Sequence, residues 1–340
     1  MGRAAISIVM RAIVIREPGG PEVLELREVP SPVPSRGEVR VRVRATAVNR
    51  ADLLQRMGAY PAPQDSPRDI PGLELAGEVD SVGEGVVDLA VGDRVFGLGG
   101  GGAYAEQIVA HARTLARMPD GMSFTDAAAI PEAFITAYDA MVTQAGLASG
   151  EVVLVSAVGS GVGTAAVQIA RAIGARSIGT ARTQDKLERA RALGMGDGVL
   201  VDRARKEAPG FADDVRARAG GRGPDVILEL VGGAYIGEDV ACAAPKGRIM
   251  LVGLIAGMRV DLDLAMVLRK RLTICGTVLR ARPLEEKIAA TNAFARHLVP
   301  LFASGALEAV VDRVMPLADA PSAHAYVASN EGFGKVVLEV

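Results

Sequence analysis

The chain has 340 residues, with 38 Lys and Arg against 40 Asp and Glu, and 49% of its residues are hydrophobic. This composition excludes a small cross-linked scaffold and a disordered chain, and it predicts two domains or one large α/β unit. The net charge of -2 supplies no overall field for nucleic acid or an anionic membrane, so neither is an expected partner. With 2 Cys and 3 His, neither a disulfide framework nor a Cys-rich zinc site can be assembled.

No membrane-spanning segment is predicted, because no apolar run approaches the roughly 20 residues that cross a bilayer. Residues 1–9 contain one Arg and a very short apolar stretch, which is too little for a signal peptide. We interpret them as a dispensable N-terminal extension, with Met10 as an alternative start. These features favour a cytoplasmic location.

The first third of the chain has the pattern of short strands and turns. Residues 39–45 alternate Val with Arg, which is the period of a strand with one solvated face. Further strands are expected at residues 10–16, 74–82, 93–96 and 103–109, with a turn at 18–21. These segments predict a small β-rich domain.

From about Ser123 the pattern changes to strands that alternate with helices. Residues 126–146 are Ala-rich and helical, with a break expected at Pro131. Six strands are predicted at residues 152–155, 177–181, 198–202, 225–231, 248–252 and 272–278, and five helices at 162–173, 186–193, 211–219, 235–242 and 262–268. Six strands with five crossovers describe a parallel, doubly wound sheet.

The C-terminal part returns to the pattern of the first third. We expect a helix at residues 284–303, a strand at 309–314, a short helix at 320–328 and a last strand at 335–340. Because these pieces resemble the β-rich domain more than the parallel sheet, the C-terminus is expected to rejoin the first domain.

The strongest motif is a glycine-rich turn between the strand at 152–155 and the helix after it. Glycines there allow a tight turn, and the helix N-terminus offers free N–H groups to a pyrophosphate. The residues predicted to hold the pyrophosphate are Gly159, Ser160, Gly161, Val162 and Gly163. Val158 and Ser160 depart from the strict Gly-x-Gly-x-x-Gly pattern, so the individual contacts stay open. The strand-turn-helix setting nevertheless indicates dinucleotide binding over an ordinary glycine-rich turn.

The end of the next strand favours NADPH over NADH. An NAD site has a carboxylate there for the ribose hydroxyls, whereas a 2′-phosphate is held by hydroxyls and cations. Ala181 stands where the acid is expected, and Arg182, Thr183 and Lys186 follow it. The alternative is that Arg182 and Lys186 are solvated surface charges.

Several spaced motifs then identify a family. They are Asn49-Arg50-Ala51-Asp52 and residues 70–79, 92–95, 130–133 and the turn at Gly159, in this order. From about Met10 to Val340 the chain resembles the medium-chain dehydrogenase/reductases. It is most similar to the zinc-independent NADPH:quinone oxidoreductases, including their tumour-suppressor-inducible subgroup.

This resemblance implies an α/β fold of two domains. A GroES-like β-rich catalytic domain is expected at residues 10–131 and 276–340. A Rossmann NADPH-binding domain with a doubly wound parallel sheet is expected at 132–275. A homodimer formed through the edge of the Rossmann sheet is also implied.

The zinc-binding positions of alcohol-dehydrogenase-like relatives are filled differently here. Those relatives take a Cys near the position of Asn49 and a His after the Pro-Gly pair, where this chain has Leu73. Neither residue is a usable ligand, and no cluster of cysteines follows residues 93–95. Without a Lewis acid, alcohol oxidation is a poor assignment, whereas an electrophilic quinone or enone can accept hydride directly.

The resemblance places Tyr60 and Ser160 where cofactor and acceptor meet, with Asn49 and Asp52 on the nicotinamide side. We interpret Tyr60, Ser160 and Asn49 as catalytic, with Tyr60 as the donor to a forming oxyanion. The structural alternatives are a packing aromatic for Tyr60, a turn residue for Ser160 and a helix cap for Asp52.

Five further positions complete the predicted cofactor site. The resemblance places Thr136 near the nicotinamide and Lys335 near the cofactor phosphates, with a core threonine and a solvated lysine as the alternatives. Gly253 and Leu254 after the fifth strand, and Arg280 after the sixth, occupy strand ends where such a sheet receives its ligand.

The leading hypothesis is an NADPH-dependent, zinc-free enzyme that transfers hydride to quinones. One rival is an enone or enoyl-thioester reductase with the same hydride delivery. Another is a non-catalytic NADPH-binding protein with a sensing, structural or RNA-binding role.

Overall fold

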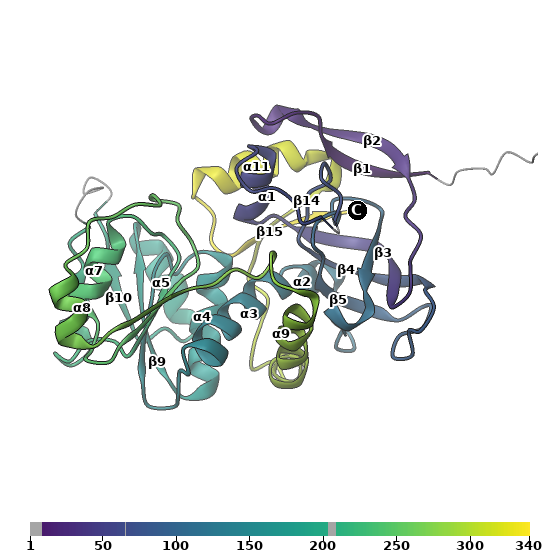
Figure 1. Ribbon diagram of the computed structural model, residues 1–340. Coiled ribbons are helices and arrows are strands. Elements are labelled where there is room, and N and C mark those ends of the chain that lie inside the picture. Colours follow the sequence, from purple (N-terminus) through teal and green to yellow (C-terminus); the bar gives the residue numbers. More distant parts are fainter. Residues whose placement is uncertain (1–8, 65, 203–208) are drawn as a thin grey trace, which may run out of the picture. The chain divides into compact units, whose positions relative to one another are not determined.

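The computed structural model describes residues 9–64, 66–202 and 209–340, and it divides into two compact units (Figure 1). The first unit comprises the described residues up to Glu132 together with Arg280–Val340, and the second comprises Ala133–Leu279. Of the predicted N-terminal extension, only Val9 lies within the described residues, where it begins the first strand.

The first unit is built on a mostly antiparallel sheet. Its strands run in the order β14-β15-β3-β4-β5-β7, with β6 paired to β3, and β1 and β2 form a separate hairpin. The strands are β1 (Val9–Ile15), β2 (Leu24–Pro30), β3 (Glu38–Ala47), β4 (Glu74–Val82), β5 (Arg94–Leu98), β6 (Gln107–His111), β7 (Leu115–Arg117), β14 (Val311–Pro316) and β15 (Lys335–Glu339). Because β15 pairs with β3, the two ends of the chain share one domain.

Strand β3 confirms the predicted two-sided pattern. Val39, Val41 and Val43 are buried, while the arginines between them face outward. Two of these arginines form ion pairs with acids of β4, Arg40 with Asp80 and Arg44 with Glu78, each at 2.7 Å. The alternation therefore separates a valine core from a charged surface within one strand.

The second unit contains the predicted parallel sheet. Its strands run in the order β10-β9-β8-β11-β12-β13, all parallel. They are β8 (Val152–Val155), β9 (Arg176–Ala181), β10 (Asp197–Leu200), β11 (Val226–Glu229), β12 (Arg248–Leu251) and β13 (Thr273–Gly276). The strand order reverses direction between β8 and β11, where doubly wound sheets bind their ligands.

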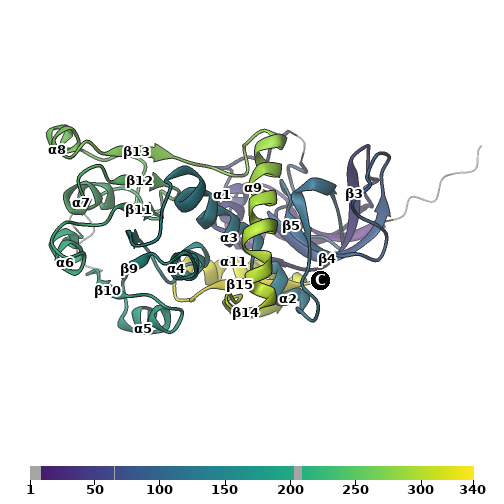
Figure 2. The ribbon, with the colours of Figure 1, turned by 90° about the horizontal axis from the view of Figure 1, so that it is seen from below.

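Helices cover both faces of this sheet (Figure 2). They are α4 (Gly161–Ile173), α5 (Gln184–Ala192), α6 (Ala212–Arg218), α7 (Tyr235–Cys242) and α8 (Leu264–Lys270), and all five match predicted helices within a few residues. The sequence from 203 to 208 lies outside the described residues. This arrangement confirms the predicted α/β fold class.

Three predicted elements differ from the structure. The helix expected at 126–146 is divided into α2 (Phe124–Ala128), α3 (Pro131–Tyr138) and a wider π-helical turn at Asp139–Gln144. The helix expected at 284–303 is divided into α9 (Leu284–His297) and α10 (Val299–Ala303), because Pro300 has no N–H to continue the first helix.

The strand expected at 103–109 begins only at Gln107, because the residues before it bond elsewhere. Tyr104 donates its N–H to Pro71 and accepts from Ile13. The first unit also contains α1 (Arg50–Arg56) and α11 (Ala320–Ser329). No helix among the described residues is long and apolar enough to span a bilayer.

Candidate functional site

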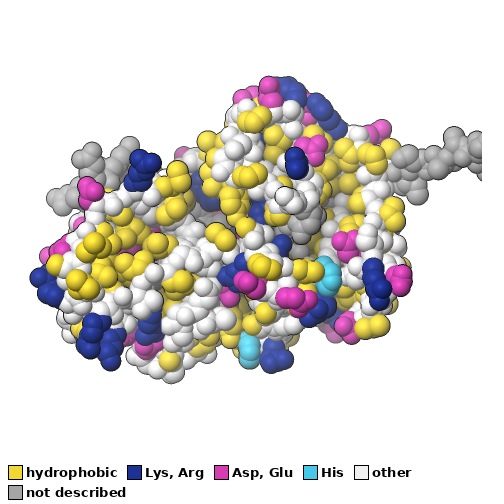
Figure 3. Space-filling view, in the orientation of Figure 1, with side chains coloured by type: hydrophobic (Ala, Val, Ile, Leu, Met, Phe, Trp, Pro, Cys, Tyr) yellow, Lys and Arg dark blue, Asp and Glu magenta, His cyan; other side chains and the backbone are white. Residues whose placement is uncertain are grey.

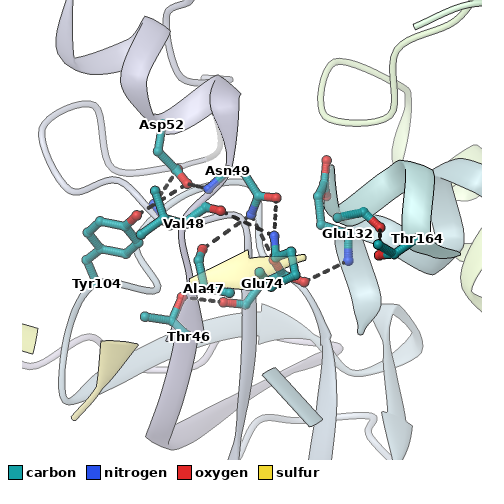
Figure 4. A network of polar contacts seen from close by, with 12 residues as sticks. Thr46, Ala47, Val48, Asn49, Asp52, Glu74, Tyr104, Glu132 and Thr164 are labelled. Carbon is teal, nitrogen blue, oxygen red and sulfur yellow. Dashed lines mark hydrogen bonds and ion pairs between the residues drawn. The ribbon is translucent and has the colours of Figure 1, made fainter. Parts of the chain in front are cut away.

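A buried polar cluster lies where three neighbouring strands of the first unit meet (Figure 4). Asn49 follows the end of β3, Glu74 begins β4 and Lys335 begins β15, so their side chains gather at one edge. Lys335 Nζ lies 2.7 Å from Glu74 Oε1 and donates to Asn49 Oδ1 at 2.5 Å and to Val48 O at 3.3 Å. The Asn49 Nδ2 group donates to Glu74 Oε1 at 2.8 Å.

These contacts define what Asn49 and Lys335 can do. The amide of Asn49 is oriented at both ends, because a lysine donates to its oxygen and its nitrogen donates to Glu74 and, at 3.3 Å, to Ala47 O. The ammonium of Lys335 is buried and has three oxygen partners within the first unit. The predicted phosphate contact of Lys335 and catalytic role of Asn49 stay predictions, while the structure shows a charge-neutral buried pair that positions Asn49.

Asp52 joins this cluster to a second chain of hydrogen bonds. Its carboxylate accepts from the backbone N–H of Asn49 at 2.8 Å and of Gly72 at 3.0 Å. Gly72 has φ +104, and a Cβ there would lie 2.7 Å from Tyr104 N, so only glycine brings its N–H to Asp52. Burial raises the pKa of Asp52 to about 6, although the two hydrogen bonds by themselves lower it. The contacts match the cap alternative for Asp52, and its cofactor contact stays a prediction.

The chain continues through Tyr104 and His324 to Arg56. Arg56 Nη1 lies 3.4 Å from His324 Nδ1, and because arginine only donates, Nδ1 is the accepting nitrogen. His324 Nε2 therefore carries the proton and donates to Tyr104 Oη at 3.2 Å, and Tyr104 donates to Asp52 at 3.4 Å. Burial, with Arg56 nearby, lowers the pKa of His324 to about 3, so the imidazole is neutral.

Tyr60 and Arg280 lie beside each other in the first unit. The guanidinium carbon of Arg280 lies 5.5 Å from the centre of the Tyr60 ring. Burial raises the pKa of the half-buried Tyr60 phenol, although Arg280 opposes this, so the phenol is protonated at neutral pH. The structure thus brings together two residues that the sequence placed far apart.

Glu74 and Glu132 are site residues that the sequence reasoning missed. Glu132 donates its backbone N–H to Glu74 Oε2 at 2.8 Å. Burial, with the negative charge of Glu74 nearby, raises the pKa of Glu132 to about 8. Glu74 lies in the motif at 70–79 and Glu132 in the motif at 130–133. In each motif, a carboxylate among apolar residues could have identified the acid as a site residue.

In the second unit, the glycine-rich turn joins β8 to α4 closely. Ser160 caps α4, its hydroxyl accepting from Gly163 N–H at 3.1 Å. A Cβ at Gly163 would lie 2.7 Å from the carbonyl oxygens of Ala157 and Val158, so this glycine lets the helix approach the strand. The bulk of Val158 is accommodated by Gly179 of β9, where a Cβ would lie 2.9 Å from Val158.

This turn fits a pyrophosphate despite the missing glycines. The first turn of α4, with Gly161 and Val162, leaves backbone N–H groups without helical partners. Gly159, in the turn before α4, is buried. The hydroxyl of Ser160 accepts one bond and keeps its proton for another acceptor.

The remaining predicted cofactor residues lie at other strand ends of the second unit. Ala181 is buried, Arg182 is exposed, and Thr183 precedes α5 without using its hydroxyl to cap it; Lys186 lies one turn into that helix. Gly253 packs against the residue that follows β11, since a Cβ there would lie 2.3 Å from Leu230 O, and Leu254 is exposed.

Thr136, on α3, offers an observation that points to a ligand. Its hydroxyl oxygen is buried without a hydrogen-bond partner among the described residues. Buried hydroxyls are normally bonded, so an unpaired one favours a bound group that completes it. Together with the turn at α4, it supports the predicted cofactor site in the second unit.

The second unit also holds a buried acid pair that the sequence analysis did not identify. Glu229, at the end of β11, accepts the N–H of Gly232 at 2.6 Å and that of Val231. Asp239 of α7 is fully buried, and burial with Glu229 nearby raises its pKa well above the usual range. Burial also raises the pKa of Glu229, so the environment of both acids favours their neutral forms.

The residues at the expected zinc positions do not fit a zinc ion. Leu73 is buried and has no ligand atom, and the oxygen of Asn49 already faces the ammonium of Lys335. Within 9–64, 66–202 and 209–340, no three His, Cys, Asp or Glu side chains are placed to hold a metal.

Comparisons with known proteins cover both units. Residues 35–120 match the model of the alcohol dehydrogenase GroES-like domain, and residues 161–295 match that of the zinc-binding dehydrogenases. Quinone oxidoreductase of Lama guanicoe is 33% identical over 337 residues, which cover 97% of each chain, and the Homo sapiens protein is 31% identical over the same span. Erythronolide synthase EryA2 of Saccharopolyspora erythraea is 38% identical over 89% of this chain, which spans 8% of that synthase.

Solved structures share the fold as well. An NAD-dependent alcohol dehydrogenase is 35% identical with a TM-score of 0.84, covering 97% of this chain and 100% of its own. A mycobacterial protein complexed with NADPH is 28% identical with a TM-score of 0.85 over the same shares, and the CurK enoyl reductase is 28% identical with a TM-score of 0.84, covering 97% of this chain and 99% of its own. The chain therefore belongs to the medium-chain dehydrogenase/reductase superfamily, as a nicotinamide-binding oxidoreductase related to the quinone oxidoreductases.

Proposed function

We propose that this protein is an NADPH-dependent, zinc-independent reductase that transfers hydride to quinones. The observation that carries the proposal is the chemistry of the first unit, where Asn49 and Leu73 stand at the metal-ligand positions and the Tyr60 phenol lies beside the Arg280 guanidinium. An acceptor that needs no Lewis acid suits this set of donors. Full-length quinone oxidoreductase relatives support the same substrate class.

The reaction divides between a hydride and a proton. Bound NADPH supplies the hydride. A quinone that accepts it becomes a hydroquinone monoanion, and one proton from water or from Tyr60 completes the hydroquinone. The first unit stabilises the negative oxygen by hydrogen bonds, and Tyr60 can donate one because its phenol stays protonated at neutral pH.

The preference for NADPH is assigned to the turn between β9 and α5. Arg182 is exposed there, and the hydroxyl of Thr183 is not used as a cap. No carboxylate stands at the end of β9 to repel a 2′-phosphate, because Ala181 takes that place. The mycobacterial structure complexed with NADPH supports this proposal, whereas the NAD-dependent alcohol dehydrogenase shows that the same fold also serves NAD.

Steady-state kinetics on chelator-treated protein test the proposal. NADPH and NADH consumption is followed with an ortho-quinone, a para-quinone, an enone and an enoyl thioester, beside direct titration of each cofactor. We expect quinone turnover that prefers NADPH and survives removal of metal. Activity that disappears with the chelator and returns with zinc would contradict the metal-free reaction.

A second candidate is reduction of an enone or enoyl thioester. It is favoured by the matches to the CurK enoyl reductase and to Erythronolide synthase EryA2, of which this chain spans 8%. The hydride would then go to the β-carbon of the activated alkene, and the charge would develop on the carbonyl oxygen of an enolate. Selective turnover of the thioester over both quinones would establish this reading. Tight NADPH binding without turnover of any acceptor would instead favour a sensing or structural role.

A further inference from the structure

Arg280 is a buried arginine beside Tyr60, and its hydrogen bonds are incomplete. The residue is 6% exposed. Its Nε donates to Gly100 O at 2.8 Å, and its Nη2 donates to Gln55 Oε1 at 2.7 Å. Its Nη1 is buried and has no partner among the described residues. A buried cationic N–H without an acceptor is costly, which favours a site completed by a bound group.

The other contacts of Arg280 hold the guanidinium in one place. Gln55 is itself fixed, because its Nε2 donates to Arg68 O at 3.1 Å. On the loop side, a Cβ at Gly101 would lie 3.2 Å from Nη2 of Arg280, so the glycine leaves room for the guanidinium. The guanidinium of Arg280 is thus held through Nε and Nη2, and Nη1 can donate to a bound group.

Nearby charges do not neutralise this group by direct contact. No carboxylate among the described residues forms an ion pair with Arg280, and the two oxygens of Asp52 bond the N–H groups of Asn49 and Gly72. The Tyr60 ring lies 5.5 Å from the guanidinium carbon, so the phenol and the cation share one neighbourhood. An anionic oxygen placed there meets a fixed positive charge in a buried environment.

We propose that Arg280 is a catalytic residue whose Nη1 hydrogen donates to the acceptor oxygen that becomes negative when hydride is transferred. The inference rests on the proposed function and names the group that stabilises the charge. Hydride transfer turns a quinone carbonyl oxygen into a phenolate oxygen, or an enone oxygen into an enolate oxygen. The donor is held before the charge appears, so it binds the product anion better than the neutral acceptor.

The first test needs no turnover. 4-Nitrophenol ionises near neutral pH, changes absorbance when it does, and mimics the hydroquinone monoanion. Its ionisation is followed on the protein with and without NADP+, in the wild type, in Arg280→Met and in the control Arg296→Met, which removes an exposed arginine of α9.

The expected result is that the wild type and Arg296→Met lower the pH at which the bound phenol ionises, whereas Arg280→Met does not. An equal shift in Arg280→Met, or no shift in the wild type, would overturn the inference. Because no hydride moves, the result stands whether or not quinones are substrates.

The second test compares acceptors of different electrophilicity. Arg280→Ala should lower kcat for a weakly electrophilic enone by about 10²-fold, as for the loss of one oxyanion donor. The loss should be smaller for a readily reduced quinone, and free guanidinium in the assay should restore part of it. NADPH affinity, measured by titration, should change little, because this proposal assigns Arg280 to the acceptor in place of the cofactor contact that the sequence predicts for it.

A purely structural role for Arg280 gives a different pattern. Equal losses on every acceptor, with no rescue by guanidinium, would show that Arg280 only holds Gln55 and the Gly100 loop. If Arg280→Ala does not fold, Arg280→Lys keeps a cation in place, and the same comparison of acceptors decides. An inactive wild type would count against the proposed function, while the nitrophenol titration would still decide the inference.

Discussion

At the scale of single residues, the first unit depends on a buried ion pair. Lys335 and Glu74 are 2.7 Å apart and almost completely excluded from solvent. Removing one partner of such a pair leaves a buried charge without compensation and costs far more than losing a surface pair.

Glu74→Gln should therefore lower the free energy of unfolding by about 3 kcal/mol, measured with urea. Glu78→Gln is the matched control, because Glu78 lies in the same strand and pairs with Arg44 at the surface. Its effect should stay below about 1 kcal/mol. Equal effects of the two substitutions would show that the Lys335 ammonium reaches solvent.

The phenol of Tyr60 provides a second prediction at this scale. Tyr60→Phe keeps the ring against Arg280 but removes the donor, so kcat with a quinone should fall by about 10²-fold with little change in NADPH affinity. Tyr326→Phe is the control, since that phenol donates to Asp312 on another part of the unit. Unchanged turnover and an unchanged pH profile in Tyr60→Phe would leave water as the proton source.

At the scale of elements, α1 and α11 are tied by the chain from Arg56 through His324 to Tyr104. The pKa of His324 lies at about 3 in the folded protein, below the usual value of 6.5. The unfolded chain therefore binds the proton first as the pH falls. This residue contributes its full stability above pH 6.5, and the contribution is lost progressively as the pH falls from there towards 3.

The free energy of unfolding should accordingly fall by up to about 1.4 kcal/mol per pH unit from this single group below pH 6. Urea titrations between pH 4 and 7 would measure the slope. In His324→Asn the slope should be smaller by the contribution of about one proton, which is about 1.4 kcal/mol per pH unit. The same slope in both proteins would mean that carboxylates dominate the acid sensitivity.

The turn from β9 into α5 provides the next prediction. Arg182→Asp places a carboxylate at the position where we propose that Arg182 contacts the 2′-phosphate. NADPH binding should weaken far more than NADH binding, because the new charge repels the phosphate and can bond ribose hydroxyls. Fluorescence titration of both cofactors measures this, and equal losses for both would reject the assignment of the 2′-phosphate site.

Elements with a strong period were predictable, and those set by distant contacts were not. Strands β3 and β8 could be recognised from the sequence of each strand alone, β3 by its alternation of valine and arginine and β8 by its run of apolar residues. The segment before β6 is decided by backbone bonds from Tyr104 to Pro71 and Ile13, which no local pattern contains.

The same distinction holds for the candidate site. The glycine-rich turn could be predicted from the sequence because Gly163 lets α4 approach residues only a few positions before it. The contacts of Arg280 with Gln55 and of Lys335 with Asn49 join residues 225 and 286 positions apart, so only the fold reveals them.

At the scale of the whole molecule, the edge of the parallel sheet is the surface where we expect a second copy of the chain to bind. Strand β13 has β12 on one side, and among the described residues nothing pairs with its other side. Exposed apolar side chains lie nearby in sequence, including Leu264 and Leu268 of α8 and Val278, and Figure 3 shows apolar side chains gathered over the part of the second unit that carries α7 and α8. An open, apolar edge strand tends to pair with another chain.

The proposed homodimer through this edge predicts a mass of about twice 35.2 kDa in solution. Replacing Leu268, which is 76% exposed, by Glu should weaken the dimer, because two copies of the new charge would face each other across a two-fold interface. Val87→Glu is the control, since Val87 is 87% exposed on the first unit. Light scattering during gel filtration would measure the masses. A wild-type monomer, or a dimer unaffected by Leu268→Glu, would place the interface elsewhere or remove it.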